Sequence, residues 1–182
     1  NIDYARIGID NGLNNGSSGS LLIRNGGQLY DTSGFIGYTA GFKGAATVTG
    51  RDSLWSNGTN LRVGYFSEGW LTISDGGAAR ASTTYVGSDA GAHGVLSIES
   101  GGSLVNATGY IGNAANATGT ATITGKGSQW ANDDSLYIGH RGDGKLTVFD
   151  SASVNAKADI YVGNTKGSTG ELLVEKGGTL SN

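Results

Sequence analysis

The sequence contains no cysteine, no proline and no methionine. The absence of cysteine excludes disulfide bridges, thiolate metal sites and thiol nucleophiles. No stretch of about 18 apolar residues occurs that could span a bilayer as a helix, and no signal-peptide hydrophobic segment opens the sequence. Neither sign of charge dominates, because 12 basic residues stand against 15 acidic ones and the net charge is −3. Without clustered lysine and arginine the chain lacks the electrostatic surface that binds phosphate, so no nucleic-acid partner is expected.

Glycine, by contrast, is abundant and accounts for 34 of the 182 residues. There is no Gly-X-Y triplet repeat and no proline, which excludes a collagen-like chain. Hydrophobic residues make up 37% of the sequence and recur at regular places, which is atypical of a disordered chain.

A β-branched residue followed by glycine recurs through the whole chain. The seven copies are Ile7-Gly8, Ile36-Gly37, Val63-Gly64, Val86-Gly87, Ile111-Gly112, Ile138-Gly139 and Val162-Gly163. Their spacing of 23–29 residues falls in the range of one solenoid unit. Residues 1–182 are therefore predicted to form a single solenoid segment, and further coils or a cap are expected to flank it in a longer protein.

Each unit carries two further signatures. One is a glycine followed by apolar, polar and apolar residues, as in Gly69 with Leu71 and Ile73, and the other is a turn such as Gly26-Gly27 that precedes one apolar side chain. This alternation predicts short strands. Three strands per unit, joined by tight turns, predict an all-β fold: a right-handed, three-faced parallel β-helix of about seven coils. Each apolar position should then stack on its own copy about 4.8 Å away.

A longer period is also present, because Trp55 and Trp130 are 75 residues apart and follow similar segments. One extra residue precedes each tryptophan, compared with the other units. This pattern predicts a matched pair of slight bulges that enlarge the core.

Three segments resemble the passenger repeats of bacterial autotransporters: Thr47-Val48-Thr49-Gly50 leading to Ser53 and Trp55, its copy Thr122-Ile123-Thr124-Gly125 leading to Ser128 and Trp130, and Leu71-Thr72-Ile73-Ser74-Asp75-Gly76-Gly77. The resemblance implies a Gram-negative cell-surface or secreted passenger, exported through a C-terminal outer-membrane β-barrel elsewhere in the parent chain. It implies a non-enzymatic role in adhesion, self-association or biofilm formation. The implied partners are a host surface glycan, an extracellular-matrix protein or a like passenger.

One outward residue precedes each β-branched residue of the first strand and defines a column. From the N-terminus these residues are Arg6, Phe35, Arg62, Tyr85, Tyr110, Tyr137 and Tyr161. One interpretation is a stacking ladder that stabilises neighbouring strands. The other is an exposed platform for carbohydrate or protein, since aromatic rings give large rigid contact areas. Tyr65, Phe66 and Trp70 are a candidate second contact point.

Arg141-Gly142-Asp143 has the sequence of an integrin-type ligand when it lies in an exposed tight turn. Only four residues separate Gly139 from Gly144, so the loop is expected to project. The alternative is an ordinary turn, because the copy 75 residues earlier also places an acidic residue, Glu68, before a glycine.

The sequence offers few groups for catalysis or metal binding. The two histidines, His93 and His140, lack metal-ligand spacing, so neither a metal site nor a cofactor is expected. Asp133-Asp134 is expected to be a solvated turn. The alternative function is a polysaccharide-degrading β-helix hydrolase or lyase, which needs two carboxyl groups at a defined gap, or a segment of a phage tailspike.

Overall fold

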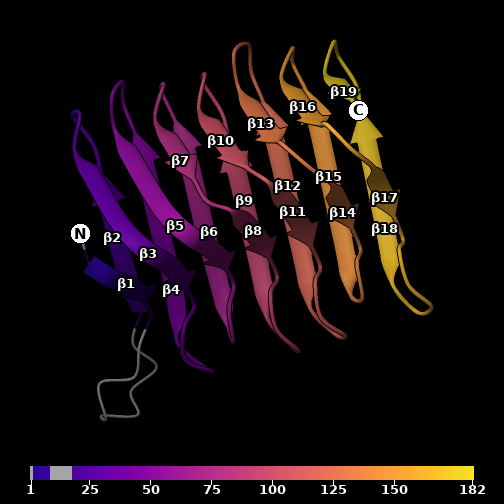
Figure 1. The fold of residues 1–182 in the computed structure, drawn as a ribbon, viewed down its shortest axis with the longest axis horizontal. Helices are drawn as coiled ribbons and strands as arrows, with labels where there is room; N and C mark the ends of the chain where they lie inside the picture. Colours follow the sequence, from indigo (N-terminus) through magenta and orange to yellow (C-terminus); the bar gives the residue numbers. More distant parts are fainter. Residues whose placement is uncertain (1, 9–17) are drawn as a thin grey trace.

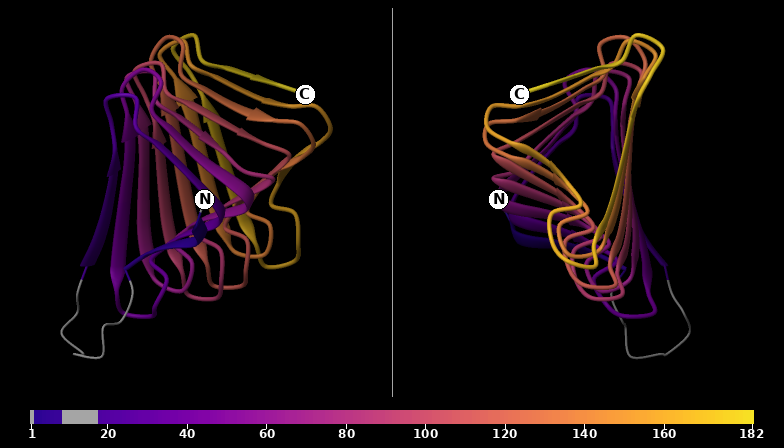
Figure 2. Two further views of the ribbon diagram at one scale, coloured as in Figure 1. Left: turned by 60° about the vertical axis from the view of Figure 1, so that its left-hand side comes forward. Right: turned by 90° about the vertical axis from the view of Figure 1, so that its right-hand side faces the viewer.

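The computed structural model describes residues 2–8 and 18–182, and this part of the chain contains strands and no helix. The strands form one 12-stranded and one 7-stranded sheet, and every neighbouring pair is parallel. They stack as a β-solenoid of about seven turns, as Figure 1 shows. The predicted parallel β-solenoid is confirmed, and the view along the stack has a triangular outline (Figure 2).

Each turn of the solenoid contains a first, a second and a third strand. The second strands form the 7-stranded sheet: β2 (Ser18–Ile23), β4 (Lys43–Thr49), β6 (Glu68–Ser74), β9 (His93–Ile98), β12 (Thr118–Thr124), β15 (Asp143–Phe149) and β18 (Thr169–Val174). The first strands are β1 (Ile2–Ile7), β8 (Thr83–Val86), β11 (Thr108–Ile111), β14 (Leu136–Ile138) and β17 (Ile160–Val162). The third strands are β7 (Ala78–Arg80), β10 (Ser103–Asn106), β13 (Gln129–Asn132), β16 (Ser153–Ala156) and β19 (Thr179–Ser181).

Two long strands join the first and third rows into the 12-stranded sheet. These are β3 (Gln28–Ile36) and β5 (Leu54–Val63), each of which serves as the third strand of one turn and the first strand of the next. The start of β5 pairs with β7 and its end pairs with β8. Between β3 and β5 the register shifts, so that β5 carries one residue more than β3 after Asp31.

The interior is built from columns of like residues, as the periodicity predicts. Ile36, Val63, Val86, Ile111 and Ile138 pair in register along the first strands and are fully buried. The third strands add a column in which the two tryptophans, Trp55 and Trp130, are also fully buried. Burial of this apolar surface is the main stabilising contribution to the fold.

Paired glycines make the corner between the first and second strands. Gly87 has φ +73°, which L side chains rarely adopt, and Gly94 packs against it. A Cβ on Gly94 would collide with the backbone nitrogen of Gly87 and the carbonyl oxygen of Val63. The recurrent glycines of the first two sequence signatures are therefore required by backbone contact between the corners.

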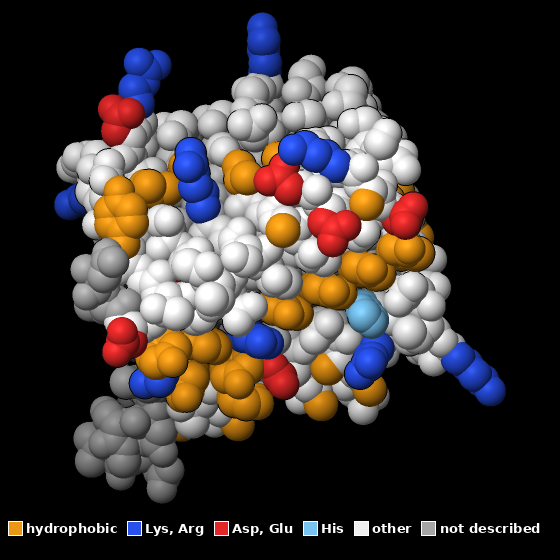
Figure 3. Space-filling view, viewed as in Figure 1, with side chains coloured by type: hydrophobic (Ala, Val, Ile, Leu, Met, Phe, Trp, Pro, Cys, Tyr) orange, Lys and Arg blue, Asp and Glu red, His pale blue; other side chains and the backbone are white. Residues whose placement is uncertain are grey.

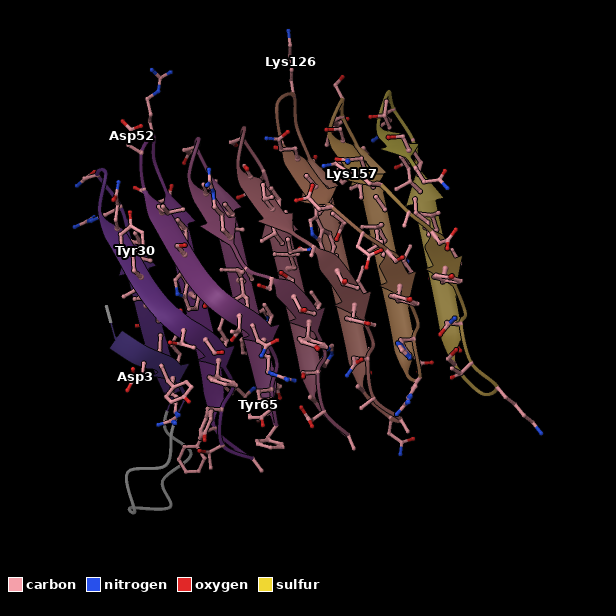
Figure 4. All side chains as sticks on the ribbon, viewed as in Figure 1. Asp3, Tyr30, Asp52, Tyr65, Lys126 and Lys157 are labelled. Carbon is pink, nitrogen blue, oxygen red and sulfur yellow. The ribbon has the colours of Figure 1, made fainter. Side chains whose placement is uncertain are left out.

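The extra residue before each tryptophan lies in a turn and not in a strand bulge. Most turns between the second and third strands have two consecutive residues with positive φ, such as Asp75 and Gly76. Before the tryptophans, positive φ occurs at Gly50 and Asp52 and again at Gly125 and Gly127, with one residue between. The predicted bulges are therefore wrong, because a longer turn absorbs the insertion. Figure 4 shows Asp52 and Lys126 at the tips of these two turns.

The indole N–H of each buried tryptophan donates a hydrogen bond to a polar side chain. Trp130 Nε1 donates to Asn106 Oδ1 at 2.7 Å, and Asn106 Nδ2 donates to Asn132 Oδ1 at 2.7 Å. In the earlier copy Trp55 Nε1 donates to Asp31 Oδ2 at 3.0 Å. A carboxyl group thus replaces an amide at one of two matched buried positions.

Asn132 also has an equivalent in the earlier copy, Asn57, which is the register partner of Asp31. Asn57 Nδ2 donates to a backbone carbonyl at 3.2 Å, as Asn132 Nδ2 does at 3.0 Å. Asp31 Oδ1 and Asn57 Oδ1, however, are both buried and have no hydrogen-bond partner in the described part of the chain. The first copy therefore lacks the amide-to-amide hydrogen bond of the second.

Candidate functional site

Four tyrosines of the predicted column form a ladder, named here the tyrosine ladder. Tyr85, Tyr110, Tyr137 and Tyr161 lie in register on β8, β11, β14 and β17. Their ring centroids are separated by 5.2, 4.8 and 4.7 Å, with interplanar angles of 9°, 7° and 7°. The column and its spacing are confirmed, and Figure 3 shows a stripe of hydrophobic side chains on this face.

The stacking determines what the ladder can present to a partner. Each inner ring has a neighbouring ring on both faces and is half-buried, which agrees with the first of the two interpretations, a stacking ladder. What remains accessible is a row of ring edges and hydroxyl groups. Burial, and then the neighbouring Tyr137 and Tyr85, raise the pKa of Tyr110, so its hydroxyl group is neutral at physiological pH.

His140 packs beside the ladder. Its ring centroid lies 5.1 Å from those of both Tyr110 and Tyr137. Its Nδ1 atom is buried and has no hydrogen-bond partner among the described residues. Burial, and secondarily the charge of Arg141, lowers the pKa of His140, so the neutral imidazole is favoured next to the rings.

Arg62 caps the ladder on the side of the N-terminus. Its guanidinium carbon lies 4.4 Å from the ring centroid of Tyr85 and 5.1 Å from that of Tyr65. Its Nη1 atom donates to Ser88 Oγ at 2.5 Å and lies 3.6 Å from Asp89 Oδ2. A cation between two ring faces is a favourable arrangement, and it connects the ladder to a second group of aromatic residues.

This second group, named here the aromatic cluster, comprises Tyr4, Phe35, Tyr38, Tyr65 and Phe66. Their neighbouring rings meet at interplanar angles between 40° and 80°, in contrast to the parallel rings of the ladder. Tyr4 is 49% exposed and Phe66 is 45% exposed. These two rings are therefore accessible to a partner, as a recognition surface requires. Figure 4 labels Tyr65 at the corner that follows the first strand.

Two members of this cluster, Tyr65 and Phe66, were expected from the sequence as a contact point together with Trp70. Trp70 lies on β6, where Lys43 Nζ is 5.8 Å from the centroid of its ring. Tyr38 was missed, although a sequence signal exists: it follows the first-strand glycine in the same way as Tyr65. Arg6 completes the surface, with its guanidinium carbon 4.8 Å from the ring centroid of Tyr4 and 5.0 Å from that of Tyr38.

The Arg141-Gly142-Asp143 loop does not project. Gly142 is buried, and a Cβ there would collide with carbonyl oxygens of Ala114 and Ala117. The amides of Gly142 and Asp143 donate to Gly112 and Ala117 of the preceding turn, at 3.1 and 2.9 Å. The expected projecting loop is therefore wrong: backbone hydrogen bonds hold it flat, although the Arg141 and Asp143 side chains are exposed.

The two adjacent carboxylates Asp133 and Asp134 lie at the surface. Asp133 pairs with Lys157 at 2.7 Å, and Asp134 accepts hydrogen bonds from Thr108 and Ser135 at 3.3 Å. This is the solvated turn that the sequence predicts. The part of the chain that the structure describes contains no group of three or more histidine, aspartate or glutamate side chains suited to a metal ion.

Comparisons with protein families, with curated protein sequences and with solved structures found no match to this chain. Across residues 2–8 and 18–182, no helix is long and apolar enough to cross a membrane. The aromatic cluster and the tyrosine ladder, joined by Arg62, are thus identified as the candidate site by their geometry alone.

Proposed function

We propose that this chain is a non-enzymatic segment of a bacterial surface passenger that serves adhesion or self-association. The observation that carries the proposal is the aromatic surface, which runs along one face from Tyr4 in the first turn to Tyr161 in the last. Aromatic side chains and arginine dominate the energetics of binding interfaces, and here both are concentrated on one face.

The two halves of this surface would contribute different contacts. The aromatic cluster offers the exposed rings of Tyr4 and Phe66, with Arg6 next to Tyr4 to bind polar or anionic groups of a partner. The ladder offers repeated hydroxyl groups and ring edges at the spacing of the strands. Because neighbouring contacts raise the effective concentration at each site, weak binding per turn gives firm attachment along the rod.

The partner proposed is a host surface glycan, an extracellular-matrix protein or a second passenger of the same kind. The placement at the bacterial cell surface follows from the resemblance of the Thr-x-Thr-Gly and Trp segments to autotransporter passengers. An integrin contact through Arg141 and Asp143 would use side chains alone, because the loop backbone is already bonded within the solenoid.

Binding of beads coated with the purified chain tests this proposal. Phe66→Ser removes an exposed ring of the aromatic cluster, and Tyr30→Ser is the matched control, because Tyr30 is 43% exposed and its hydroxyl group donates to Gln28, outside the aromatic surface. We expect Phe66→Ser to reduce bead clumping or attachment to matrix- and glycan-coated surfaces, with Tyr30→Ser equal to the parent.

The ladder is tested in the same assay with Tyr110→Ser combined with Tyr137→Ser. Far-UV circular dichroism establishes that each variant keeps its strands. If Phe66→Ser and the double ladder variant both adhere as well as the parent, the aromatic surface is not the binding surface and the proposal is wrong.

A further inference from the structure

We propose that the tyrosine ladder is an oxidative modification site, at which a one-electron oxidant of the peroxide and haem-peroxidase class joins neighbouring tyrosines by a dityrosine bond. The bond would link one turn of the solenoid to the next. The inference is independent of the adhesive role, since it depends only on how the rings are held.

The geometry of the ladder brings equivalent atoms together. In-register parallel strands place each ring beside an identical ring, with centroids 4.7–5.2 Å apart. The ring carbons ortho to the hydroxyl groups are the atoms that couple in dityrosine. Because the rings of register partners are nearly parallel and adjacent, rotation about the Cβ–Cγ bonds together with a small approach of the two rings would bring such carbons together.

The structure also supplies a proton acceptor at the last ring. Tyr161 donates its hydroxyl hydrogen to Asp159 Oδ2 at 2.9 Å. When Tyr161 loses an electron, this carboxylate can accept the proton, which leaves a neutral phenoxyl radical. Tyr137, whose ring centroid lies 4.7 Å away, is the only ladder tyrosine in contact with Tyr161, so the first bond is expected between these two.

The reaction balances without a leaving group. Tyr137 and Tyr161 each lose one electron and one hydroxyl proton, and the two radicals combine by a carbon–carbon bond between ortho carbons. Each ring then regains aromaticity when its ortho hydrogen is lost and its oxygen is protonated again. The net loss of two electrons and two protons reduces one hydrogen peroxide to two water molecules.

Other tyrosines of the chain are less well placed. Tyr38 and Tyr65 are 5.6 Å apart, and their rings are tilted by 40°. Both of these rings are also covered by arginine, Tyr38 by Arg6 and Tyr65 by Arg62. A dityrosine bond in the ladder would give this cysteine-free chain a covalent link between turns, which raises its thermal stability by restricting the unfolded chain.

The experiment treats the purified chain, at low concentration, with a haem peroxidase and hydrogen peroxide, followed by trypsin and mass spectrometry. Tyr137 and Tyr161 fall in separate tryptic peptides, 127–141 and 158–166. We expect these two peptides to be joined with the loss of two hydrogen atoms, together with dityrosine fluorescence. Tyr161→Phe should abolish the joined peptide, and Tyr30→Phe should leave its yield unchanged.

Asp159→Asn separates the contribution of the proton acceptor from that of the ring stack. It should slow formation of the joined peptide several-fold, while a crystal structure or circular dichroism shows the strands unchanged. The proposal is overturned if no dityrosine forms, if the bonds form mainly between molecules, or if Tyr38–Tyr65 or Tyr30 products exceed Tyr137–Tyr161.

Discussion

Replacing Asp31 by asparagine should stabilise the protein at neutral pH. Among the residues that the structure describes, no donor reaches the buried Asp31 Oδ1 and Asn57 Oδ1, whereas in the matched copy Asn106 donates to Asn132 at 2.7 Å. An amide at position 31 would provide the missing N–H. A buried acceptor without a partner costs about 1–3 kcal/mol, so Asp31→Asn should raise the free energy of unfolding by about that amount at pH 7.

The pH dependence identifies the cause. Burial raises the pKa of Asp31 from its ordinary 3.8, against the opposing effects of the hydrogen bond from Trp55 and of the nearby backbone of Ala5. No charged side chain of β1 or β5, the neighbouring strands, contributes to this shift. The protonated carboxyl group can donate to Asn57, so its stabilising contribution is complete below pH 3.8 and is lost as pH rises through the raised pKa.

Urea unfolding of the parent and of Asp31→Asn from pH 3.5 to 8 measures this difference. The stability advantage of the variant should be large at pH 8 and vanish toward pH 3.5. Asn106→Asp is the reciprocal variant, and its free energy of unfolding should show the same dependence on pH. Equal stability of parent and Asp31→Asn at every pH would refute the reasoning.

Three further predictions follow from the corners, the ladder and the buried tryptophan. Gly94→Ala should lower the free energy of unfolding by about 1–3 kcal/mol, because the added Cβ would collide with backbone atoms. Gly91→Ala has open space around its Cβ and should lower the free energy of unfolding by about 1 kcal/mol, because alanine is strained at a positive φ. Urea unfolding of the two variants measures the difference. His140, whose pKa is lowered by burial, should make the protein less stable as pH falls below 6.5, and thermal melts of His140→Phe should lack this acid sensitivity. Trp130→Phe should cost about 1–3 kcal/mol in urea unfolding, since Asn106 Oδ1 loses its donor.

The sequence was sufficient to predict the strands, their parallel stacking and the order of the columns. Each apolar side chain and each corner glycine recurs at one period, and a period of this kind permits few folds. The tyrosine column was predictable for the same reason, because Tyr110 and Tyr137 occupy equivalent positions in adjacent turns.

Details that depend on contacts between turns could not be predicted. The Arg141–Asp143 loop lies flat because Gly142 fits against Ala114 and Ala117, which are more than 20 residues away in the sequence. The tilt of the rings in the aromatic cluster depends on unlike neighbours such as Phe35 and Arg62, whereas like neighbours stack in the ladder. The extra residue before Trp130 could fit either a strand or a turn, and only the φ values show that it lies in the turn.

Cysteine pairs test the in-register stack most directly, because the chain has no cysteine of its own. Thr122 and Thr147 are register partners on β12 and β15. Oxidation of the Thr122→Cys, Thr147→Cys variant should form a disulfide rapidly, since register partners on adjacent strands lie within the Cα separation that a disulfide spans. The control pair Thr120→Cys, Thr147→Cys is offset by two residues and should remain reduced. Rapid bonding of the offset pair, or none in the register pair, would contradict the stacked solenoid on which the aromatic surface depends.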